Sequence, residues 1–314
     1  MNTIEKLVDK LAQEIDDQWQ DGVIADPVGD PLISSHPVPE EGQETVVRPG
    51  QWVDRENPAS KKFDLDFVRL KELGFFTPDI THSKLSEELR VVKRRLLSNC
   101  FDPEMEFKGD PRLIMVTSAT SGEGKTFLAI NLALSLATEI DRSVLLVDTD
   151  MVKGDVMTVL GVDSERGLTD VLASERLDIR DALVATNIES LTLLPAGPMR
   201  NDATELFSSE KMVRLINDLS RRYPDRLVIF DTPPLLAATE AHVLAALVGQ
   251  VVLVVEAQRT TQAYLAEALE QLADSKARVS LLLNKSHEKD EAEYYYGQYK
   301  GREGRESMAP TKAR

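Results

Sequence analysis

A run of eight residues at 119–126, Ala-Thr-Ser-Gly-Glu-Gly-Lys-Thr, limits what this chain can fold into more than any other feature. It follows a short apolar segment at 113–117 and precedes a segment with helical spacing at 127–138. Gly122 and Gly124 allow the backbone to bend so that N–H groups converge on one anion, and the start of the following helix adds partial positive charge. The order of strand, glycine-bearing loop and helix is that of a P-loop, which cradles nucleotide phosphates.

The same run supplies side chains for phosphate chemistry. Lys125 is placed to reach the β- and γ-phosphates, and the Thr126 hydroxyl to ligate magnesium. Ala119 stands where the pattern usually has glycine, and the simpler alternative is a glycine turn that only caps a helix. The strand–loop–helix order favours nucleotide binding. We expect the nucleotide to contact this loop and the end of the last strand, through Ser121, Gly122, Glu123, Gly124, Lys125, Thr126, Phe127 and Asn284.

Short apolar runs alternate with helical segments from residue 112 onward. The strand candidates are rich in Val, Ile and Leu and lie at 113–117, 144–147, 191–194, 227–230, 251–255 and 279–283. Near-continuous apolar runs are typical of parallel strands that are buried on both faces. The pattern therefore predicts an α/β fold with a doubly wound, mostly parallel sheet, in which ligands lie beyond the carboxyl ends of the strands.

The remaining segments differ from this core in composition. Residues 1–20 have one narrow apolar stripe at helical spacing, which predicts an amphipathic helix that either docks on a partner or packs on its own domain. Residues 21–62 are rich in proline, glycine and acids and are interpreted as a flexible linker. We expect the P-loop domain at 63–285 and a mobile tyrosine-rich tail at 286–314.

Carboxylates follow two of the predicted strands. Asp148 and Asp150 end one strand, and Asp231 ends another in a Walker B pattern. Magnesium prefers oxygen ligands and usually takes one or two carboxylates beside phosphates and water, which leaves one aspartate for another role. The alternative for a single strand-end aspartate is a helix cap or turn residue. Asn284 and Lys285 resemble a guanine-reading loop, but His287 stands where that loop has its carboxylate, which favours adenine.

Composition excludes several classes of protein. The formal net charge is −16, with no basic stripe, so nucleic acid is not an expected partner. A single cysteine, Cys100, rules out a disulfide framework within the chain and fits a reducing cytoplasm. The four histidines are far apart, without a cysteine cluster, so no zinc site is expected. The longest apolar run, 243–248, is too short to span a membrane, which needs about 20 residues.

Three motifs together resemble the bacterial tyrosine kinase (BY-kinase) family, which belongs to the MinD/ParA-like class of P-loop NTPases. They are Thr-Ser-Gly-Glu-Gly-Lys-Thr at 120–126, Val-Asp-Thr-Asp at 147–150 and Phe-Asp-Thr-Pro-Pro at 230–234. More narrowly, the segments at 3–7 and 73–79 resemble the stand-alone autokinases of exopolysaccharide loci associated with exosortase. The signature lysine that MinD/ParA relatives carry early in the P-loop is missing here, since this region reads Ala119, Thr120 and Ser121.

The resemblance implies a role for each strand-end carboxylate. Asp148 would activate a tyrosine hydroxyl, and Asp150 and Asp231 would help Thr126 to hold Mg²⁺, with ATP as phosphate donor. A general base is useful because a tyrosine phenol has a pKa of about 10. In this family an arginine usually follows the first acidic strand end, and Val152 replaces it here.

The resemblance also implies an acceptor. Four of the six tyrosines lie within six residues of one another in a polar segment, at Tyr294, Tyr295, Tyr296 and Tyr299. BY-kinases carry such a cluster and phosphorylate it in trans; the alternative for this chain is a partner-binding tail. A helical line of Glu87, Arg90 and Lys93 matches the Glu-x-x-Arg-x-x-Arg line that joins family members into rings, with lysine in the last position.

The expected function is therefore an ATP-dependent tyrosine autokinase that regulates exopolysaccharide polymerisation and export. Its expected partners are a membrane polysaccharide co-polymerase that activates it, other copies of itself, and a phosphotyrosine phosphatase. It is expected in the cytoplasm, held at the inner membrane through the partner protein. Two alternatives are a MinD/ParA-like ATPase switch without kinase activity and a non-catalytic ATP-binding scaffold.

Overall fold

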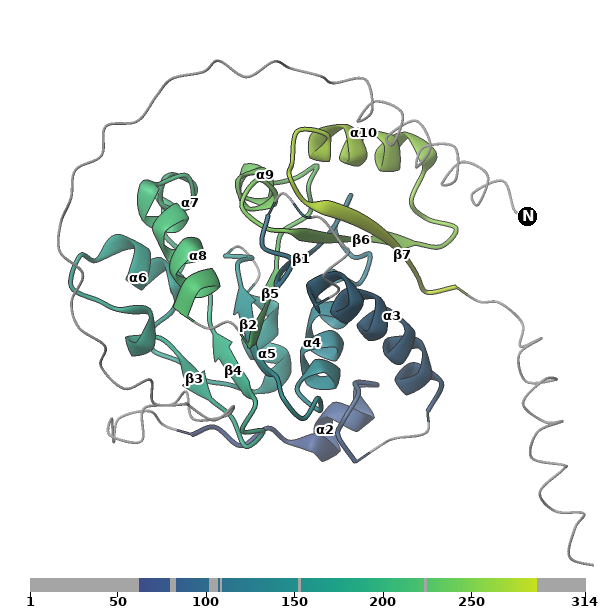
Figure 1. The fold of residues 1–314 in the computed structure, drawn as a ribbon, viewed down its shortest axis with the longest axis horizontal. Helices are drawn as coiled ribbons and strands as arrows, with labels where there is room; N and C mark the ends of the chain where they lie inside the picture. The colour runs from purple at the N-terminus through teal and green to yellow at the C-terminus, as the bar shows by residue number, and fades with distance from the viewer. Residues whose placement is uncertain are drawn as a thin grey trace, which may run out of the picture. The chain divides into compact units, whose positions relative to one another are not determined.

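The computed structural model describes residues 62–79, 83–101, 107, 109–151, 154–222 and 225–286. The predicted N-terminal helix, nearly all of the predicted linker, Val152 and the tail tyrosines lie outside these residues. The described part is built around one sheet whose strands alternate with helices (Figure 1). The predicted α/β fold class is thus confirmed.

The sheet has seven strands among the described residues, in the order β3-β4-β2-β5-β1-β6-β7. All neighbouring strands pair in parallel except β3, which is antiparallel to β4. The strands are β1 Leu113–Ser118, β2 Ser143–Asp148, β3 Val184–Ala185, β4 Leu191–Leu194, β5 Arg226–Asp231, β6 Gln250–Glu256 and β7 Arg278–Asn284. All six predicted strands are therefore confirmed, and β3 is an addition.

Helices cover both faces of the sheet (Figure 1). One group consists of α2 Phe67–Glu72, α3 Lys84–Phe101, α4 Lys125–Leu136 and α5 Asp155–Leu160. The other group consists of α6 Leu168–Ala173, the short 3-10 helix η1 Ile179–Asp181, α7 Ala203–Phe207, α8 Glu210–Arg222, α9 Thr239–Ala245 and α10 Gln262–Leu272.

Successive residues of the central strands alternate between two apolar cores. In β1, Leu113 and Met115 belong to the core under α6 to α10, while Ile114 and Val116 belong to the core under α2 to α5. Every residue of β1 is buried. The continuous apolar pattern seen in the sequence therefore reflects a strand that is covered on both sides.

The helix α3 is fixed by polar contacts at its C-terminal half as well as by packing against α4. The Asn99 amide donates to the side chain of Gln250 at 2.7 Å, and Gln250 in turn donates to the backbone carbonyl of Pro111 at 2.6 Å. Asn99 and Gln250 are both buried. This network joins α3 to the first residues of β6 and fixes the helix next to the edge of the sheet where the strands begin.

No helix among the described residues combines the length and the apolar composition that a membrane span requires.

Candidate active site

The P-loop connects the end of β1 to the start of α4. Gly124 is the N-cap of α4 and has a left-handed backbone, with φ of +99°. Gly122 has φ of +90°. Residues other than glycine rarely adopt this backbone conformation. Both positions therefore need glycine if the loop is to turn its N–H groups inward. A Cβ at Gly124 would also lie 2.1 Å from the side-chain nitrogen of Asn284.

A buried carboxylate inside the loop fixes its shape. Glu123 is fully buried, and its Oε2 accepts a hydrogen bond from the backbone N–H of Thr120 at 2.7 Å. Its other oxygen, Oε1, accepts from the hydroxyl of Thr260, in the loop between β6 and α10. The Glu123 side chain therefore points into the protein, and its contribution to a nucleotide site is the conformation of the loop. Thr260 was not identified from the sequence.

The end of β7 supports the loop from a second direction. The Asn284 amide donates to the carbonyl of Glu123 at 2.9 Å, and the Lys285 ammonium donates to the carbonyl of Gly122 at 2.8 Å. Lys285 also pairs with Glu256 at 3.1 Å, and Glu256 pairs with Arg259 at 2.9 Å. Both ion pairs are at the surface, so their effect is mainly to orient these cations beside the P-loop.

The three strand-end aspartates meet at the carboxyl edge of the sheet. Asp148 and Asp231 lie directly opposite each other in the pairing of β2 with β5. Just beyond them, the backbone N–H and the hydroxyl of Thr149 both donate to the carbonyl of Asp231, at 2.9 and 2.7 Å. Asp150 follows, and its N–H donates to the carboxylate of Asp148 at 3.1 Å. The structure thus brings together the carboxylates that the sequence predicted for this edge.

Lys125 faces the same group of acids. Its ammonium lies 3.0 Å from Oδ2 of Asp150 and 3.4 Å from the Thr126 hydroxyl. The side chains of Lys125 and Asp150 are only 7% and 4% exposed, so the pair is almost completely removed from water. The predicted catalytic lysine and one predicted magnesium ligand are therefore paired with each other in this structure.

Burial makes the other two aspartates weak acids. Burial and the neighbouring charge of Asp231 raise the pKa of Asp148 to about 8. Burial raises the pKa of Asp231 to about 7, although the positive charge of Lys125 opposes this shift. Oδ2 of Asp148 and both carboxylate oxygens of Asp231 are buried and have no hydrogen-bond partner among the described residues. Buried polar atoms without partners are uncommon, and a catalytic role or a bound ion is a frequent reason for them.

This arrangement fits a magnesium ion bound together with nucleotide phosphates. The available donors are hard oxygens, the hydroxyl of Thr126 and the carboxylates of Asp150 and Asp231, which magnesium prefers. The described residues contain no group of three acidic, histidine or cysteine side chains that could hold a metal alone. Phosphate oxygens and water would therefore have to complete the coordination, as is usual for magnesium in nucleotide sites.

Two other predicted residues, Phe127 and Lys93, have side chains that contact their own domain. The Phe127 ring packs against Phe75, with ring centroids 4.8 Å apart, so its side chain belongs to the core beneath α4. On α3, Lys93 forms an ion pair with Glu139 at 2.7 Å and donates to the carbonyl of Ser135 at 3.2 Å. Of the predicted ring residues, Lys93 is therefore held inside its own chain.

Comparison with known proteins gives a consistent result. The family AAA_31, described as an AAA domain, matches residues 111–288. The tyrosine-protein kinase YwqD of Bacillus subtilis is 34% identical over 214 residues, covering 68% of this chain and 86% of YwqD. A putative tyrosine-protein kinase of Ralstonia nicotianae, EpsB, is 32% identical over 219 residues, which cover 70% of this chain but only 28% of EpsB.

A solved structure, that of the chimerical protein CapA2B2, is similar with a TM-score of 0.59 and 26% identity, and the similarity covers 71% of this chain and 93% of that one. The chain has a P-loop with acidic strand ends beside it, and it covers 86% of YwqD at 34% identity. These findings lead to one conclusion. The chain belongs to the bacterial tyrosine-protein kinase family.

Proposed function

We propose that this protein is an autokinase that transfers the γ-phosphate of Mg-ATP to tyrosines of its own C-terminal tail, Tyr294, Tyr295, Tyr296 and Tyr299. The observation that carries the proposal is the meeting of Lys125, Asp148, Asp150 and Asp231 at one edge of the sheet. Asp148 and Asp231 also have carboxylate oxygens without a hydrogen-bond partner among the described residues. This is the set of groups that phosphoryl transfer needs, since the reaction depends on positioning and on neutralising charge.

In the proposed reaction a tail tyrosine oxygen attacks the γ-phosphorus, the bond from that phosphorus to the bridging oxygen breaks, and ADP leaves. The phenol proton passes to Asp148. Lys125 moves from Asp150 to the β- and γ-phosphates, where its charge stabilises the transition state. Bound Mg²⁺ would neutralise phosphate charge beside Thr126, Asp150 and Asp231, and its positive charge would favour the ionised form of nearby carboxylates. Asp148 must be ionised to accept the phenol proton. Without the charge of Mg²⁺, its pKa of about 8 leaves it mostly protonated at pH 7.

We also propose that the kinase acts in exopolysaccharide polymerisation and export, with a separate membrane polysaccharide co-polymerase as activator and a phosphatase that resets the tail. The relatives YwqD and EpsB, both named as tyrosine-protein kinases, support the kinase part of this proposal. The partner would hold the kinase at the cytoplasmic side of the membrane. Copies would join into a ring through α3, with Glu87, Arg90 and Lys93 as contacts. Lys93 would contribute less than a free side chain, because it already pairs with Glu139 of its own chain.

The test is to incubate the purified full chain with Mg-ATP and to map phosphotyrosine by mass spectrometry. Phosphate should appear on the tail tyrosines of the wild type, with a rate per molecule that rises with protein concentration if transfer occurs between copies. Lys125→Met should abolish it. ATP hydrolysis with an unmodified tail, both alone and with the cytoplasmic segment of the co-polymerase, would refute the proposal in favour of an ATPase switch.

A further inference from the structure

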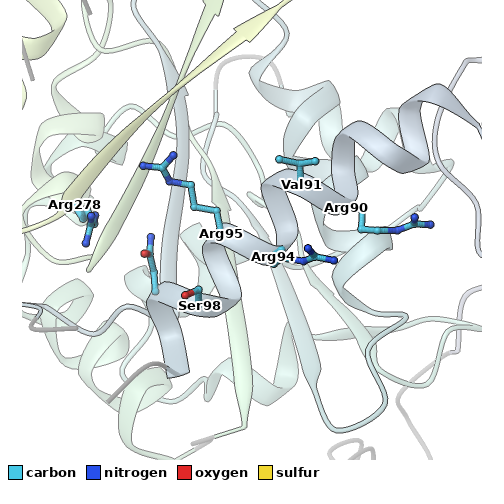
Figure 2. Close-up of a pocket in the computed structure, with 7 residues that line it drawn as sticks. Arg90, Val91, Arg94, Arg95, Ser98 and Arg278 are labelled. Atoms are coloured by element: carbon cyan, nitrogen blue, oxygen red, sulfur yellow. The ribbon is translucent and has the colours of Figure 1, made fainter. Parts of the chain in front are cut away.

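A cleft lined by arginines lies outside the active site, between α3 and the start of β7 (Figure 2). Its volume is about 430 Å³. Arg90, Arg94 and Arg95 come from α3 and Arg278 from β7, with Val91 and Ser98 between them. Four arginines thus line one cleft on a chain whose net charge is −16, with Arg95 and Arg278 on one side of it and Arg90 and Arg94 on the other (Figure 2).

The arginines of α3 are available to a ligand. Arg90, Arg94 and Arg95 are exposed, and they form no ion pair with any described residue. Because Arg90 is also proposed above as a ring contact, binding in the cleft is assigned mainly to Arg94, Arg95 and Arg278. The Arg278 guanidinium is positioned over the ring of Phe107, 5.9 Å from its centre. Val91, at 72% exposure, gives the cleft an apolar patch among the cations. Guanidinium groups bind carboxylates and phosphates with paired hydrogen bonds, and an apolar patch beside them suits an aromatic ring.

The backbone beneath the cleft is rigid. Asn99, which also lines it, is buried and bonded to Gln250, which ties α3 to β6. β7 pairs with β6 in parallel along its whole length, from Arg278 to Asn284. The cations are therefore presented from elements that are fixed relative to each other, which limits the entropy lost when a ligand binds.

The C-terminal segment of the same chain has the matching chemistry. Between 288 and 299 it carries Glu288, Asp290, Glu291 and Glu293 against a single lysine, followed by four tyrosines. Each phosphate added to a tyrosine brings a charge of about −1.5 to −2 and three acceptor oxygens on an aromatic ring. Phosphotyrosine thus combines the anion and the ring that the cleft accommodates.

The segment is also long enough to reach the cleft. Arg278 opens β7 and Asn284 ends it, six residues later, so the two lie about 20 Å apart along the strand. From Ser286 to Tyr294 there are eight residues, which span about 26 Å when extended. A segment that leaves the sheet beside the P-loop can therefore return to its opposite edge within one molecule.

We infer that this cleft binds the chain's own C-terminal segment, 288–299, once its tyrosines carry phosphate. The cleft then holds the product of the reaction away from the P-loop, since it lies at the edge of the sheet where β7 begins. The inference rests on the proposed function for the origin of the phosphate, but the binding itself does not require kinase activity. It can therefore be tested with phosphate placed by chemical synthesis.

The experiment uses labelled peptides of residues 286–301, one unmodified and one with phosphate on all four tyrosines. Fluorescence anisotropy measures their binding to the full chain, treated beforehand with a phosphatase that is then removed, without nucleotide. We expect the phosphopeptide to bind at least about 10-fold more tightly than the unmodified peptide, and Arg94→Glu/Arg95→Glu to weaken it by at least about 10-fold. The matched control Arg176→Glu/Arg221→Glu, with the same change of charge at exposed sites elsewhere, should bind as the wild type does.

Three results would overturn the inference. The first is equal phosphopeptide affinity in the wild type and in the Arg94→Glu/Arg95→Glu protein, with circular dichroism showing that both are folded. The second is tighter binding, dependent on the same arginines, of a peptide from the acidic segment 1–30. The third is a preference of the cleft for vesicles of equal parts phosphatidylcholine and phosphatidylglycerol, measured as flotation that the phosphopeptide does not compete. None of these results bears on whether the protein phosphorylates its tail.

Discussion

The Lys125 ammonium lies 3.0 Å from the Asp150 carboxylate, in a pair that is almost completely removed from water. A buried pair of this kind stabilises a protein weakly when intact, but removing one partner leaves an uncompensated buried charge. Lys125 is also the residue proposed to reach the phosphates, so it has to exchange Asp150 for nucleotide when the substrate binds. A substitution at Lys125 should therefore change both the stability of the fold and the rate of the proposed reaction.

Lys125→Met should lower tail phosphorylation by at least about 100-fold, because a group that stabilises transition-state charge is lost. It should also lower the free energy of unfolding by about 3–5 kcal/mol, because Asp150 is left buried without its partner. Kinase assays and urea denaturation measure the two effects. In Lys125→Met/Asp150→Asn most of the stability should return while activity stays absent. Recovery of activity in the double variant would show that Lys125 has no direct role in the transfer.

The stability of the nucleotide-free protein should fall as pH rises from about 4 to about 8. The pKa values of Asp148 and Asp231 are raised to about 8 and about 7, so in this window the folded state holds protons that the unfolded state has released. Above this window the loss is complete, because both states have then released these protons.

Urea denaturation at a series of pH values measures this dependence. Asp148→Asn should make the profile shallower, because an amide does not ionise and only Asp231 of the two then contributes. A matched control is Asp64→Asn, on a carboxylate that is exposed. An unchanged profile in Asp148→Asn would show that the pKa of this carboxyl is not raised in the folded protein.

Thr260→Val should weaken ATP binding by about 10-fold with little change in the rate at saturating ATP. The substitution removes the hydroxyl that donates to Glu123 and leaves a buried carboxylate oxygen without its partner, which costs about 1–3 kcal/mol. The loop would then have to be ordered by the nucleotide itself. Titration with a fluorescent ATP analogue measures the affinity, and Thr158→Val on an exposed face of α5 serves as the control. Equal affinities in the two variants would remove Thr260 from the support of the P-loop.

Gly124→Ala should weaken nucleotide binding by at least about 10-fold, because Asn284 must move and lose its hydrogen bond to Glu123, whereas Gly74→Ala should leave binding intact. Both glycines have a left-handed backbone, with φ of +99° and +80°, so both substitutions introduce backbone strain of about 1–2 kcal/mol. Only at Gly124 does the new Cβ meet a neighbour, the Asn284 side chain at 2.1 Å, while nothing lies within 4 Å at Gly74. Thermal unfolding and nucleotide titration separate the common strain from the local clash. Loss of binding in both variants would point to general destabilisation instead.

The sheet was predictable from the sequence because its strands are buried on both faces and read as unbroken apolar runs. The two-residue strand β3 was missed, since two residues show no period and this strand runs antiparallel at the edge. The start of α4 was expected at residue 127 but is at Lys125, because Gly124 caps the helix through backbone geometry alone.

The candidate site was predictable where its residues follow strands, and less so where it depends on contacts between loops. Asp148 and Asp231 were expected at one edge, and the register of β2 with β5 places them opposite each other. The contact of Thr260 with Glu123 joins positions 137 residues apart, and no local pattern signals it. The pairing of Lys125 with Asp150 was also not foreseen, because motif spacing describes the site with nucleotide bound.

The position of β7 determines how a pull on the C-terminal segment would act on the P-loop. β7 supports the P-loop through Asn284 and Lys285, and the tyrosine-bearing segment continues from the same strand a few residues later. Tension on that segment would act first on the hydrogen bonds of Asn284 and Lys285 to the P-loop. Only after these break would it act on the hydrogen bonds between β7 and β6, which would be loaded in shear. The short contacts would yield before the long ladder does. We therefore expect a pull on the tail to loosen the P-loop while the domain stays folded.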